Sequence, residues 1–492
     1  MRVTSAASYL AIACASLLAG CPDRTISEVN PQQGRVEYKE IPVTLNRNLD
    51  LLFVVDDSPS MLDKQNNIKA NFPKFIEVLN TIQGGLPDVH IGVVSSDMGT
   101  KGTADSAAGP AIGQIGQGGC SGTGKSGNLQ VGGAGTDLQN GANFISDIKQ
   151  SDGTRQKNYS GDLATVFGKL AGLGAGGCGF EQHLLAMRRA LEGNPANANF
   201  LRPDAFLAVI FLADEDDCTF SRSTLLSPES AAMGPLQSFR CNRFGHLCSV
   251  GGKTENEMNT VGPKDQCSPN ENSQYLEKVS SFVDFLKNIK GKENASKVIV
   301  AGIMGDTAPY QVELRPPPGG GPNQPAIAHS CSYQGASGLE VADPPIRIKF
   351  LLDQFPNRST FTTICQRDLS DGLQLIAQLL KSVIGDPCID GKLADVDPNT
   401  PGPQYECSVS DVTNPRKETQ EETILPQCND AISVKPCWRI TSDPANCKKC
   451  DTTKPDDPNC LATEPHHVLK IERAVSPAPE TLIFANCVTE AI

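Results

Sequence analysis

The 492-residue chain has no excess of basic residues: 43 Lys and Arg stand against 56 Asp and Glu, a formal net charge of −13. Proteins that bind nucleic acid need clustered positive charge to neutralise phosphates, so nucleic acid is not an expected partner. Aromatic residues are also few, at 5%, with one tryptophan, Trp438. A hydrophobic content of 39% still suffices for a core, and the length predicts two or three domains.

The chain also lacks the motifs of common catalytic sites, because neither G-x-S-x-G nor H-E-x-x-H occurs. The stretch GTGKSG at 122–127 has no buried strand before it and lacks the spacing of a phosphate-binding loop. Asp56-Asp57 is followed by Ser58, where a phosphoaspartyl enzyme would carry a second aspartate. We therefore expect that the protein is not an enzyme.

No apolar run approaches the roughly 18 residues of a membrane-spanning helix. The run Tyr9–Leu18, behind Arg2, has the length typical of a signal peptide. It leads into Leu18-Ala19-Gly20-Cys21, which resembles the lipobox of bacterial lipoproteins. This resemblance implies removal of residues 1–20, acylation of Cys21, and a lipid anchor in the bacterial cell envelope, at the outer membrane or cell surface. The alternative is an ordinary signal peptide with Cys21 unmodified.

Cysteines are plentiful, with 18 in the chain. Besides Cys14 and Cys21, an even number remains, which is typical of disulfides in an exported protein. These candidates are Cys120, Cys178, Cys218, Cys241, Cys248, Cys267, Cys331, Cys365, Cys388, Cys407, Cys428, Cys437, Cys447, Cys450, Cys460 and Cys487. Their connectivity stays open, and zinc on Cys447 and Cys450, with Cys437 and Cys460, is the weaker alternative.

Buried strands and amphipathic helices alternate between residues 48 and 385. Strands are predicted at Leu51–Val55, Val89–Ser95, Phe206–Ala213 and Val298–Met304, and helices at Tyr275–Ile289, Pro345–Phe355 and Asp371–Val383. Continuous apolar strands separated by helices predict an α/β fold, a doubly wound, mainly parallel sheet with helices on both faces.

This domain, 48–385, is predicted to carry long irregular insertions at about 98–141, 215–270 and 305–344. Residues 21–47 are polar and are predicted to be a tether. Residues 386–492 are predicted to form a small disulfide-rich β or loop module, in which Val468–Arg473 and Leu482–Ala485 pair as a hairpin.

A cluster of side-chain oxygens follows the first predicted strand. Asp56-x-Ser58-x-Ser60 places three oxygen-bearing side chains at alternate positions, where a strand end bends into a loop. Mg²⁺ prefers such oxygen ligands. The motif resembles the D-x-S-x-S signature of von Willebrand factor A (VWA) domains, the first part of their metal-ion-dependent adhesion site.

The resemblance implies two further loops. Asp214, directly after Phe206–Ala213, matches the family's second metal-binding aspartate, although Glu215 replaces a glycine. The loop that carries a threonine in the family matches Gly176-Gly177-Cys178, so Cys178 occupies the threonine position, and Glu181 or a water is the candidate substitute. Asp216 and Asp217 are expected to be solvated loop charges.

Two functions stay open on this evidence. The first is a lipid-anchored cell-envelope protein whose VWA-like domain uses Mg²⁺, Mn²⁺ or Ca²⁺ to contact a carboxylate of a protein or matrix ligand. The alternative is a structural surface protein with an inactive, degenerate metal site.

Overall fold

The computed structural model describes residues 35–42, 46–82, 85–317, 320–385, 387–389, 391–397, 399, 402–415, 418–429, 434–442, 467–475, 477 and 481–490. The predicted signal peptide 1–20, Cys21, Cys447, Cys450 and Cys460 lie outside these residues. The chain divides into two compact units. We call Glu40–Cys388 with Thr441–Val468 the α/β unit, and Met1–Lys39 with Ile389–Ile440 and Leu469–Ile492 the C-terminal unit.

The α/β unit is built on a seven-stranded sheet of order β14-β9-β6-β2-β3-β4-β5. The strands are β2 Asn48–Val55, β3 Asp88–Ser95, β4 Ile145–Lys149, β5 Arg155–Lys157, β6 Phe206–Leu212, β9 Val298–Met304 and β14 Ser359–Thr363. The pairs β2–β3, β2–β6, β6–β9 and β9–β14 are parallel, whereas β3–β4 and β4–β5 are antiparallel. The chain proceeds from β2 outward in both directions, which confirms the predicted doubly wound, mainly parallel sheet.

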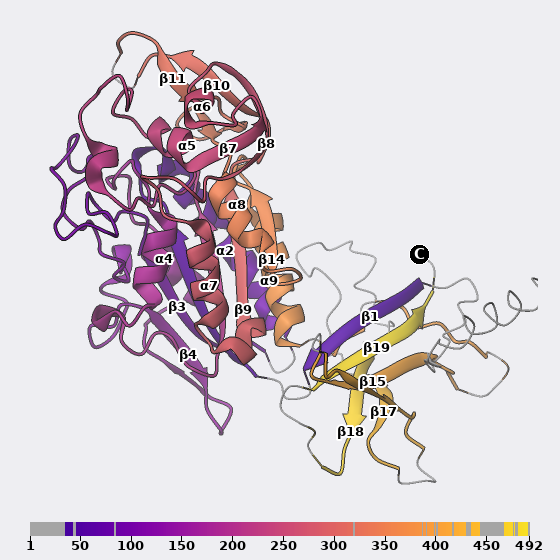
Figure 1. Cartoon of the computed structure of the whole chain (residues 1–492). Helices are drawn as coiled ribbons and strands as arrows, with labels where there is room; N and C mark the ends of the chain where they lie inside the picture. The colour runs from indigo at the N-terminus through magenta and orange to yellow at the C-terminus, as the bar shows by residue number, and fades with distance from the viewer. Residues whose placement is uncertain are drawn as a thin grey trace, which may run out of the picture. The chain divides into compact units, whose positions relative to one another are not determined.

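Helices cover both faces of this sheet (Figure 1). They are α2 Leu62–Asn80, α3 Leu163–Leu170 and α9 Ser370–Ile384 on one face, and α4 His183–Leu191, α7 Val279–Asn288 and α8 Ile346–Asp353 on the other. Alternate residues of β2 join the two cores: Phe53 packs with α2, α3 and α9, and Leu52 packs with α4, α7 and α8. Burial on both faces explains why these strands are continuously apolar.

The second and third insertions fold together, so the prediction that they are irregular was wrong. Strands β7 His246–Val250, β8 Gly262–Pro269, β10 Tyr310–Arg315 and β11 Gln324–Ile327 form an antiparallel sheet of order β11-β10-β8-β7. Helices α5 Phe239–Gly245 and α6 Glu255–Met258 lie in the second insertion, and β12 Cys331–Gln334 and β13 Leu339–Ala342 form a hairpin in the third. Short strands whose partners are distant in sequence carry little local signal.

The C-terminal unit contains a second sheet, of order β1-β19-β15-β16. Its strands are β1 Arg35–Pro42, β15 Cys407–Thr413, β16 Glu421–Leu425 and β19 Leu482–Thr489, and β17 Cys437–Ser442 pairs separately with β18 His467–Glu472. Part of the predicted tether is therefore an edge strand. The two segments of the predicted hairpin are both strands, but in different sheets, because Cys487 pairs in register with Cys407 and is bonded to it.

Disulfides tie the long connections together. They join Cys120 to Cys178, Cys218 to Cys241, Cys248 to Cys267, Cys331 to Cys365, Cys407 to Cys487 and Cys428 to Cys437, and Cys388 is also disulfide-bonded. Cys437 is therefore not available as a zinc ligand. Among the residues that the structure describes, no helix is both long and apolar enough to cross a membrane.

Two leucines on α9 test the assignment of the sheet-facing core. Leu373 is fully buried, whereas Leu375 is 48% exposed. We expect Leu373→Ala to lower the free energy of unfolding by about 2–5 kcal/mol, because it removes packed volume from the core. Leu375→Ala, the same chemical change on the same helix, should cost far less. Thermal and urea unfolding of both variants checks this, and equal losses would contradict the placement of α9.

Candidate metal site at the carboxyl edge of the sheet

Asp56 and Asp214 lie at the same edge of the sheet because they follow neighbouring parallel strands. Val55 is paired with Leu212, and the Asp56 amide donates to the Leu212 carbonyl over 2.9 Å. The strand order reverses around β2, and ligands of doubly wound sheets bind at the carboxyl ends of the strands at such a point. The structure thus brings the two predicted aspartates together.

The loop after β2 gathers the oxygens of the predicted motif. Asp56 is fully buried, and its Oδ1 accepts a hydrogen bond from the Ser58 amide at 2.8 Å. The hydroxyls of Ser58 and Ser60 are 3.1 Å apart, with Ser58 buried and Ser60 exposed. The second carboxylate oxygen of Asp56, Oδ2, is buried and has no hydrogen-bond partner among the described residues. The loop therefore offers one carboxylate oxygen and two hydroxyls that could serve as ligands.

Asp214 is held by a buried lysine. Its Oδ2 lies 2.9 Å from Nζ of Lys64, which is 1% exposed and lies in the first turn of α2. The same ammonium lies 2.9 Å from Oε2 of Glu340 and donates to the Ser60 carbonyl at 3.0 Å. The other oxygen of Asp214, Oδ1, is buried and has no partner among the described residues. Each aspartate therefore has one bonded oxygen and one orphaned oxygen.

The third predicted loop supplies no hydroxyl, because Cys178 is bonded to Cys120. The loop approaches the first one closely: the Gly177 amide donates to the Asp57 carbonyl at 2.7 Å. A Cβ at position 177 would lie 2.3 Å from Oδ1 of Asp57, so only glycine fits there. Glu181, the predicted substitute ligand, is 2% exposed. It adds a further buried carboxylate, besides those of Asp56 and Asp214, from the segment that precedes α4.

Burial and mutual repulsion perturb these carboxyl groups. Burial, followed by the charges of Asp214 and Glu215, raises the pKa of Asp56 well above its usual value. Burial, Glu215 and Asp56 do the same to the pKa of Glu181. Burial and the charges of Asp343 and Asp214 raise the pKa of Glu215 to about 8. Like charges gathered away from water disfavour ionisation. Asp56, Glu181 and Glu215 therefore keep their protons to higher pH than free carboxyl groups do.

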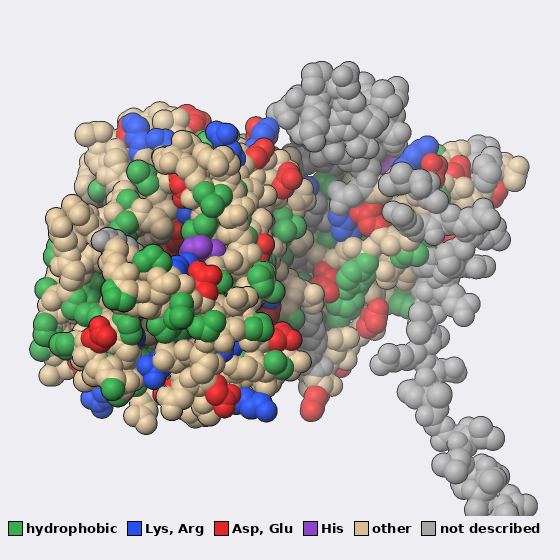
Figure 2. Space-filling view, turned by 90° about the horizontal axis from the view of Figure 1, so that it is seen from above, with side chains coloured by type: hydrophobic (Ala, Val, Ile, Leu, Met, Phe, Trp, Pro, Cys, Tyr) green, Lys and Arg blue, Asp and Glu red, His purple; other side chains and the backbone are tan. Residues whose placement is uncertain are grey.

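The insertions cover this cluster. Figure 2 looks down on the end of the α/β unit that carries α5, β10 and β11 in Figure 1, and acidic, basic and hydrophobic side chains are intermixed on that face. A cavity of about 10 Å³, room for roughly one water molecule, lies beneath. Its lining includes Glu181, Glu215 and Asp343, with Ser238 and Asn242 of α5. Glu181 and Asp343 are therefore largely enclosed, whereas Glu215 is half-buried and Ser60, on the loop after β2, is exposed.

The prediction that Asp216 and Asp217 are solvated loop charges was wrong, since both are buried. Asp216 accepts from the Arg347 and Ile348 amides at the start of α8, at 2.7 and 3.1 Å, and from Nε2 of His246 at 2.8 Å. Burial raises the pKa of Asp216, but these bonds outweigh burial and leave it below its usual value.

Asp217 has a similar structural role. Its Oδ1 accepts from the Leu184 amide at the start of α4 at 2.9 Å, and its Oδ2 pairs with Arg347 at 3.1 Å. Carboxylates at helix N-termini satisfy free amides there. The acidic stretch 214–217 thus divides: its first two residues face the candidate site, and its last two fasten α4 and α8 to the sheet edge.

His183 lies close to the site and was not predicted. It is fully buried, its Nε2 is 3.9 Å from Oδ2 of Asp56, and neither ring nitrogen has a hydrogen-bond partner among the described residues. Burial lowers its pKa although four carboxylates oppose this. A neutral imidazole supplies no positive charge, so His183 does not relieve the repulsion around Asp56.

Sequence reasoning also missed Lys64 and Glu340. Lys64 continues the apolar stripe of α2 that includes Ile68 and Phe72, and a lysine on a buried stripe was the available signal. Glu340 lies 276 residues further along the chain, in an insertion predicted as loop, and no local pattern pointed to it. The sequence therefore held a signal for Lys64 but none for its partner Glu340.

The donor set at this edge fits a hard divalent cation. Asp56, Asp214, Ser58 and Ser60 present only oxygen, the ligand type that Mg²⁺ and Ca²⁺ prefer. The two orphaned buried carboxylate oxygens are polar atoms that otherwise go unsatisfied at a cost. A cation here would be held by these four residues, with Glu181 adding negative charge nearby.

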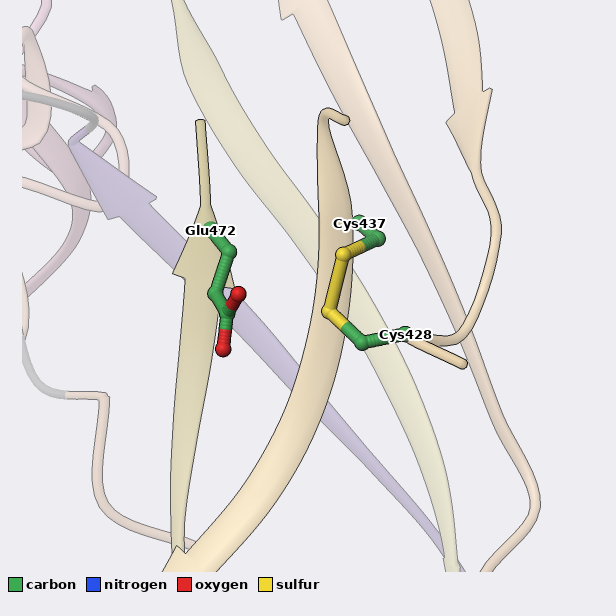
Figure 3. Close-up of side chains that lie close together, drawn as sticks. All are labelled: Cys428, Cys437 and Glu472. Carbon is green, nitrogen blue, oxygen red and sulfur yellow. A yellow bond between two sulfur atoms is a disulfide. The ribbon is translucent and has the colours of Figure 1, made fainter. Parts of the chain in front are cut away.

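Another group at first sight suits a metal but does not fit one. Within the described residues, Cys428, Cys437 and Glu472 have ligand atoms all within 4.8 Å of one another. Figure 3 shows that the two sulfurs are bonded to each other, and the carboxylate of Glu472 is paired with Arg439 at 2.7 Å. A disulfide has no thiolate to offer a metal.

Comparisons with known proteins were made by sequence and by structure. No family model matches the sequence, and no curated protein matches it. Solved structures similar to the chain include a von Willebrand factor type A protein from Catenulispora acidiphila, with 10% identity, a TM-score of 0.27, and coverage of 94% of this chain and 67% of that one.

Two further similar structures have 10% identity. For proximal thread matrix protein 1 from the mussel byssus the TM-score is 0.27, and the match covers 70% of this chain and 50% of that protein. For the pilus adhesin from Streptococcus pneumoniae the TM-score is 0.25, and the match covers 93% of this chain and 58% of the adhesin. The chain thus spans about half to two thirds of these proteins. Such low scores do not assign a family, and the fold assignment rests on the observed strand order.

The raised pKa of Glu215 predicts a pH dependence of the metal-free protein. Between the usual pKa of about 4.5 and the folded value of about 8, the folded state keeps a proton that the unfolded chain has released. Stability should therefore fall as pH rises through this window, by up to about 1.4 kcal/mol per pH unit from this group. Glu215→Gln should show a shallower decline than the wild type in chelator, measured by urea unfolding from pH 5 to 8.5.

Exposed Glu192 provides the control, since Glu192→Gln should keep the wild-type slope. The lowered pKa of His183 makes stability rise with pH below its usual value of 6.5. This contribution cancels when the variants are compared, because all of them contain His183. Parallel curves for the wild type and Glu215→Gln would contradict the electrostatic description of the cluster.

Proposed function

We propose that the chain is an exported, lipid-anchored protein of the bacterial cell envelope, whose α/β unit is a VWA-like binding domain. In this proposal Asp56, Ser58, Ser60 and Asp214 hold a divalent cation, Mg²⁺ or in its place Mn²⁺ or Ca²⁺. The bound cation accepts a carboxylate from a protein or matrix ligand. The observation that carries the proposal is the pair of orphaned buried oxygens, Asp56 Oδ2 and Asp214 Oδ1, at the switch point of the sheet.

The charge balance supports a cation. Asp56, Asp214, Glu181 and Glu215 repel one another when they are ionised, and Lys64 contacts Asp214. A divalent ion would supply the missing positive charge and satisfy the orphaned oxygens together. Two neutral hydroxyls among its ligands would leave it electrophilic enough to take a carboxylate from outside.

Export is supported by the disulfides, which persist in oxidising compartments outside the cytosol. The α/β unit alone contains bonds from Cys120 to Cys178 and from Cys331 to Cys365 that join distant segments. The lipid anchor rests on Leu18-Ala19-Gly20-Cys21. A single acyl group binds membranes weakly, and several acyl chains on one cysteine would hold the protein firmly.

A structural surface protein with an inactive site is the second candidate. The bond between Cys178 and Cys120 favours it, because this bond removes the position at which the family has a threonine hydroxyl. The two candidates differ in their response to metal. A working site gives a metal effect that Asp56→Ala removes, whereas an inactive site gives none in the wild type either.

We expect millimolar Mg²⁺, Mn²⁺ or Ca²⁺ to raise the melting temperature of the wild-type protein relative to chelator. A cation that binds only the folded state stabilises it by about 2.7 kcal/mol at a hundredfold excess over its Kd. Asp56→Ala should abolish this shift yet remain folded, because it removes a repelled carboxylate and little core volume. Differential scanning calorimetry of both proteins, with and without each ion, is the measurement.

Asp284→Ala, at an exposed position of α7, is the matched control and should keep the full shift. Ligand capture from matrix or envelope proteins, run with and without chelator on the wild type and Asp56→Ala, tests the binding role. Absence of any metal shift in the wild type, or equal shifts in the wild type and Asp56→Ala, would favour the structural protein.

The anchor gives a separate prediction. Cys21→Ser should release the protein from the membrane fraction, because no acyl chain could then be attached. Fractionation of expressing bacteria, followed by detergent extraction of the membranes, checks this. A variant that stays wholly in the membrane fraction would contradict lipid anchoring without affecting the metal site.

A further inference from the structure

Lys64 is enclosed in the carboxylate cluster and is placed at its centre by α2. Only 1% of the residue is exposed, and its ammonium contacts Asp214 at 2.9 Å, Glu340 at 2.9 Å and the Ser60 carbonyl at 3.0 Å. Two of these three partners, Asp214 and Ser60, also belong to the proposed metal ligands. The ammonium therefore lies beside the proposed cation site, bonded to Oδ2 of Asp214 and to the Ser60 backbone carbonyl, while Oδ1 of Asp214 is left for the cation.

A bound cation and this ammonium would repel each other. Charges a few ångströms apart in a partly desolvated site interact far more strongly than in water. Lys64 and a divalent ion would also share the carboxylate of Asp214, which has one oxygen in contact with Lys64 and one orphaned. Cation binding at Asp214 must therefore weaken the hold of that carboxylate on the lysine.

Glu340 is a second carboxylate partner for the Lys64 ammonium. It lies on β13, and the β12–β13 hairpin is fastened to α2 beside the site. Tyr333 donates to Oδ2 of Asp63 at 2.8 Å, the Ala336 amide donates to Oδ1 of Asp63 at 3.2 Å, and Asn67 donates to Tyr333 at 3.0 Å. The disulfide from Cys331 to Cys365 ties the base of the hairpin to the segment that follows β14. Glu340 is thus presented to Lys64 by a fixed element.

We propose that Lys64 is a built-in counter-ion that competes with a divalent cation for Asp214 and so sets the cation affinity of the site. When a cation binds, the Lys64 ammonium moves away from Asp214 and toward Glu340. The inference rests on the proposed function, since it concerns the same site. It assigns to Lys64 and Glu340 a role in metal affinity that neither the motif nor the strand pattern contains.

The test is metal affinity in the full chain with Lys64→Met, which keeps the length and apolar stem of the side chain and removes its charge. Isothermal titration with Mg²⁺, Mn²⁺ and Ca²⁺ should give a Kd at least tenfold lower than that of the wild type. In chelator the variant should melt at a lower temperature, because Asp214 and Glu340 lose their counter-charge. Lys74→Met on the same helix, where Lys74 pairs with half-exposed Glu77, should match the wild type in both measurements.

Glu340→Gln provides a second variant should Lys64→Met fold poorly. Glu340 is 16% exposed by its side chain, and glutamine can still accept a hydrogen bond there. Loss of its charge leaves the ammonium with Asp214 alone, so metal affinity should fall several-fold. The two variants therefore change the Kd in opposite directions, which a general loss of stability would not produce.

The outcomes separate the inference from the proposed function. Equal affinities for the wild type, Lys64→Met and Glu340→Gln overturn the inference and leave metal binding intact. A wild type that binds no metal, beside a Lys64→Met variant that binds it, supports the competition and overturns metal binding by the native chain. Absence of binding in all folded variants overturns both proposals. Loss of binding in Lys64→Met alone overturns the competition, because Lys64 would then be a residue that positions Asp214 for the metal.

Discussion

Two aspartates that end neighbouring parallel strands cannot be moved apart without breaking the sheet. Asp56 directly follows β2, and one residue, Ala213, separates Asp214 from the end of β6. The two strands stay in register up to Val55 and Leu212. Both side chains are buried, so water does not screen their repulsion. The surrounding structure must supply positive charge at this edge, and the contacts of the neighbouring loops follow from that requirement.

Lys64 supplies positive charge at this edge, and the neighbouring loops and insertions hold the surrounding groups in place. Lys64 brings an ammonium from α2, and the β12–β13 hairpin brings Glu340 to balance it in turn. The bond between Cys120 and Cys178 holds the third loop in place, where a threonine would have contributed an oxygen in a VWA domain. Asp217 secures the start of α4 next to that loop. The site thus combines an acidic centre with a buried lysine and a disulfide.

The sheet and the two aspartates could be predicted because their signals are local. Long apolar strands such as β6 specify burial by themselves. Asp56 comes directly after β2, and Asp214 follows β6 with one residue, Ala213, between them. The roles of Asp216 and Asp217 could not be predicted, since their partners are helix starts that only the folded chain brings near. The same holds for the strands of the second and third insertions, which pair with each other across the sequence. Lys64 was visible as a charge on an apolar stripe, but its partner Glu340 was not.

The central claim is that a divalent cation binds between the carboxylates of Asp56 and Asp214. The most direct measurement is a crystal structure of the protein with Mn²⁺, with anomalous differences recorded near the manganese absorption edge. The account predicts an anomalous peak bounded by Asp56, Ser58, Ser60 and Asp214, with the Lys64 ammonium moved away from Asp214 toward Glu340. An ordered site with no peak there, and with Lys64 still paired to Asp214, would contradict it.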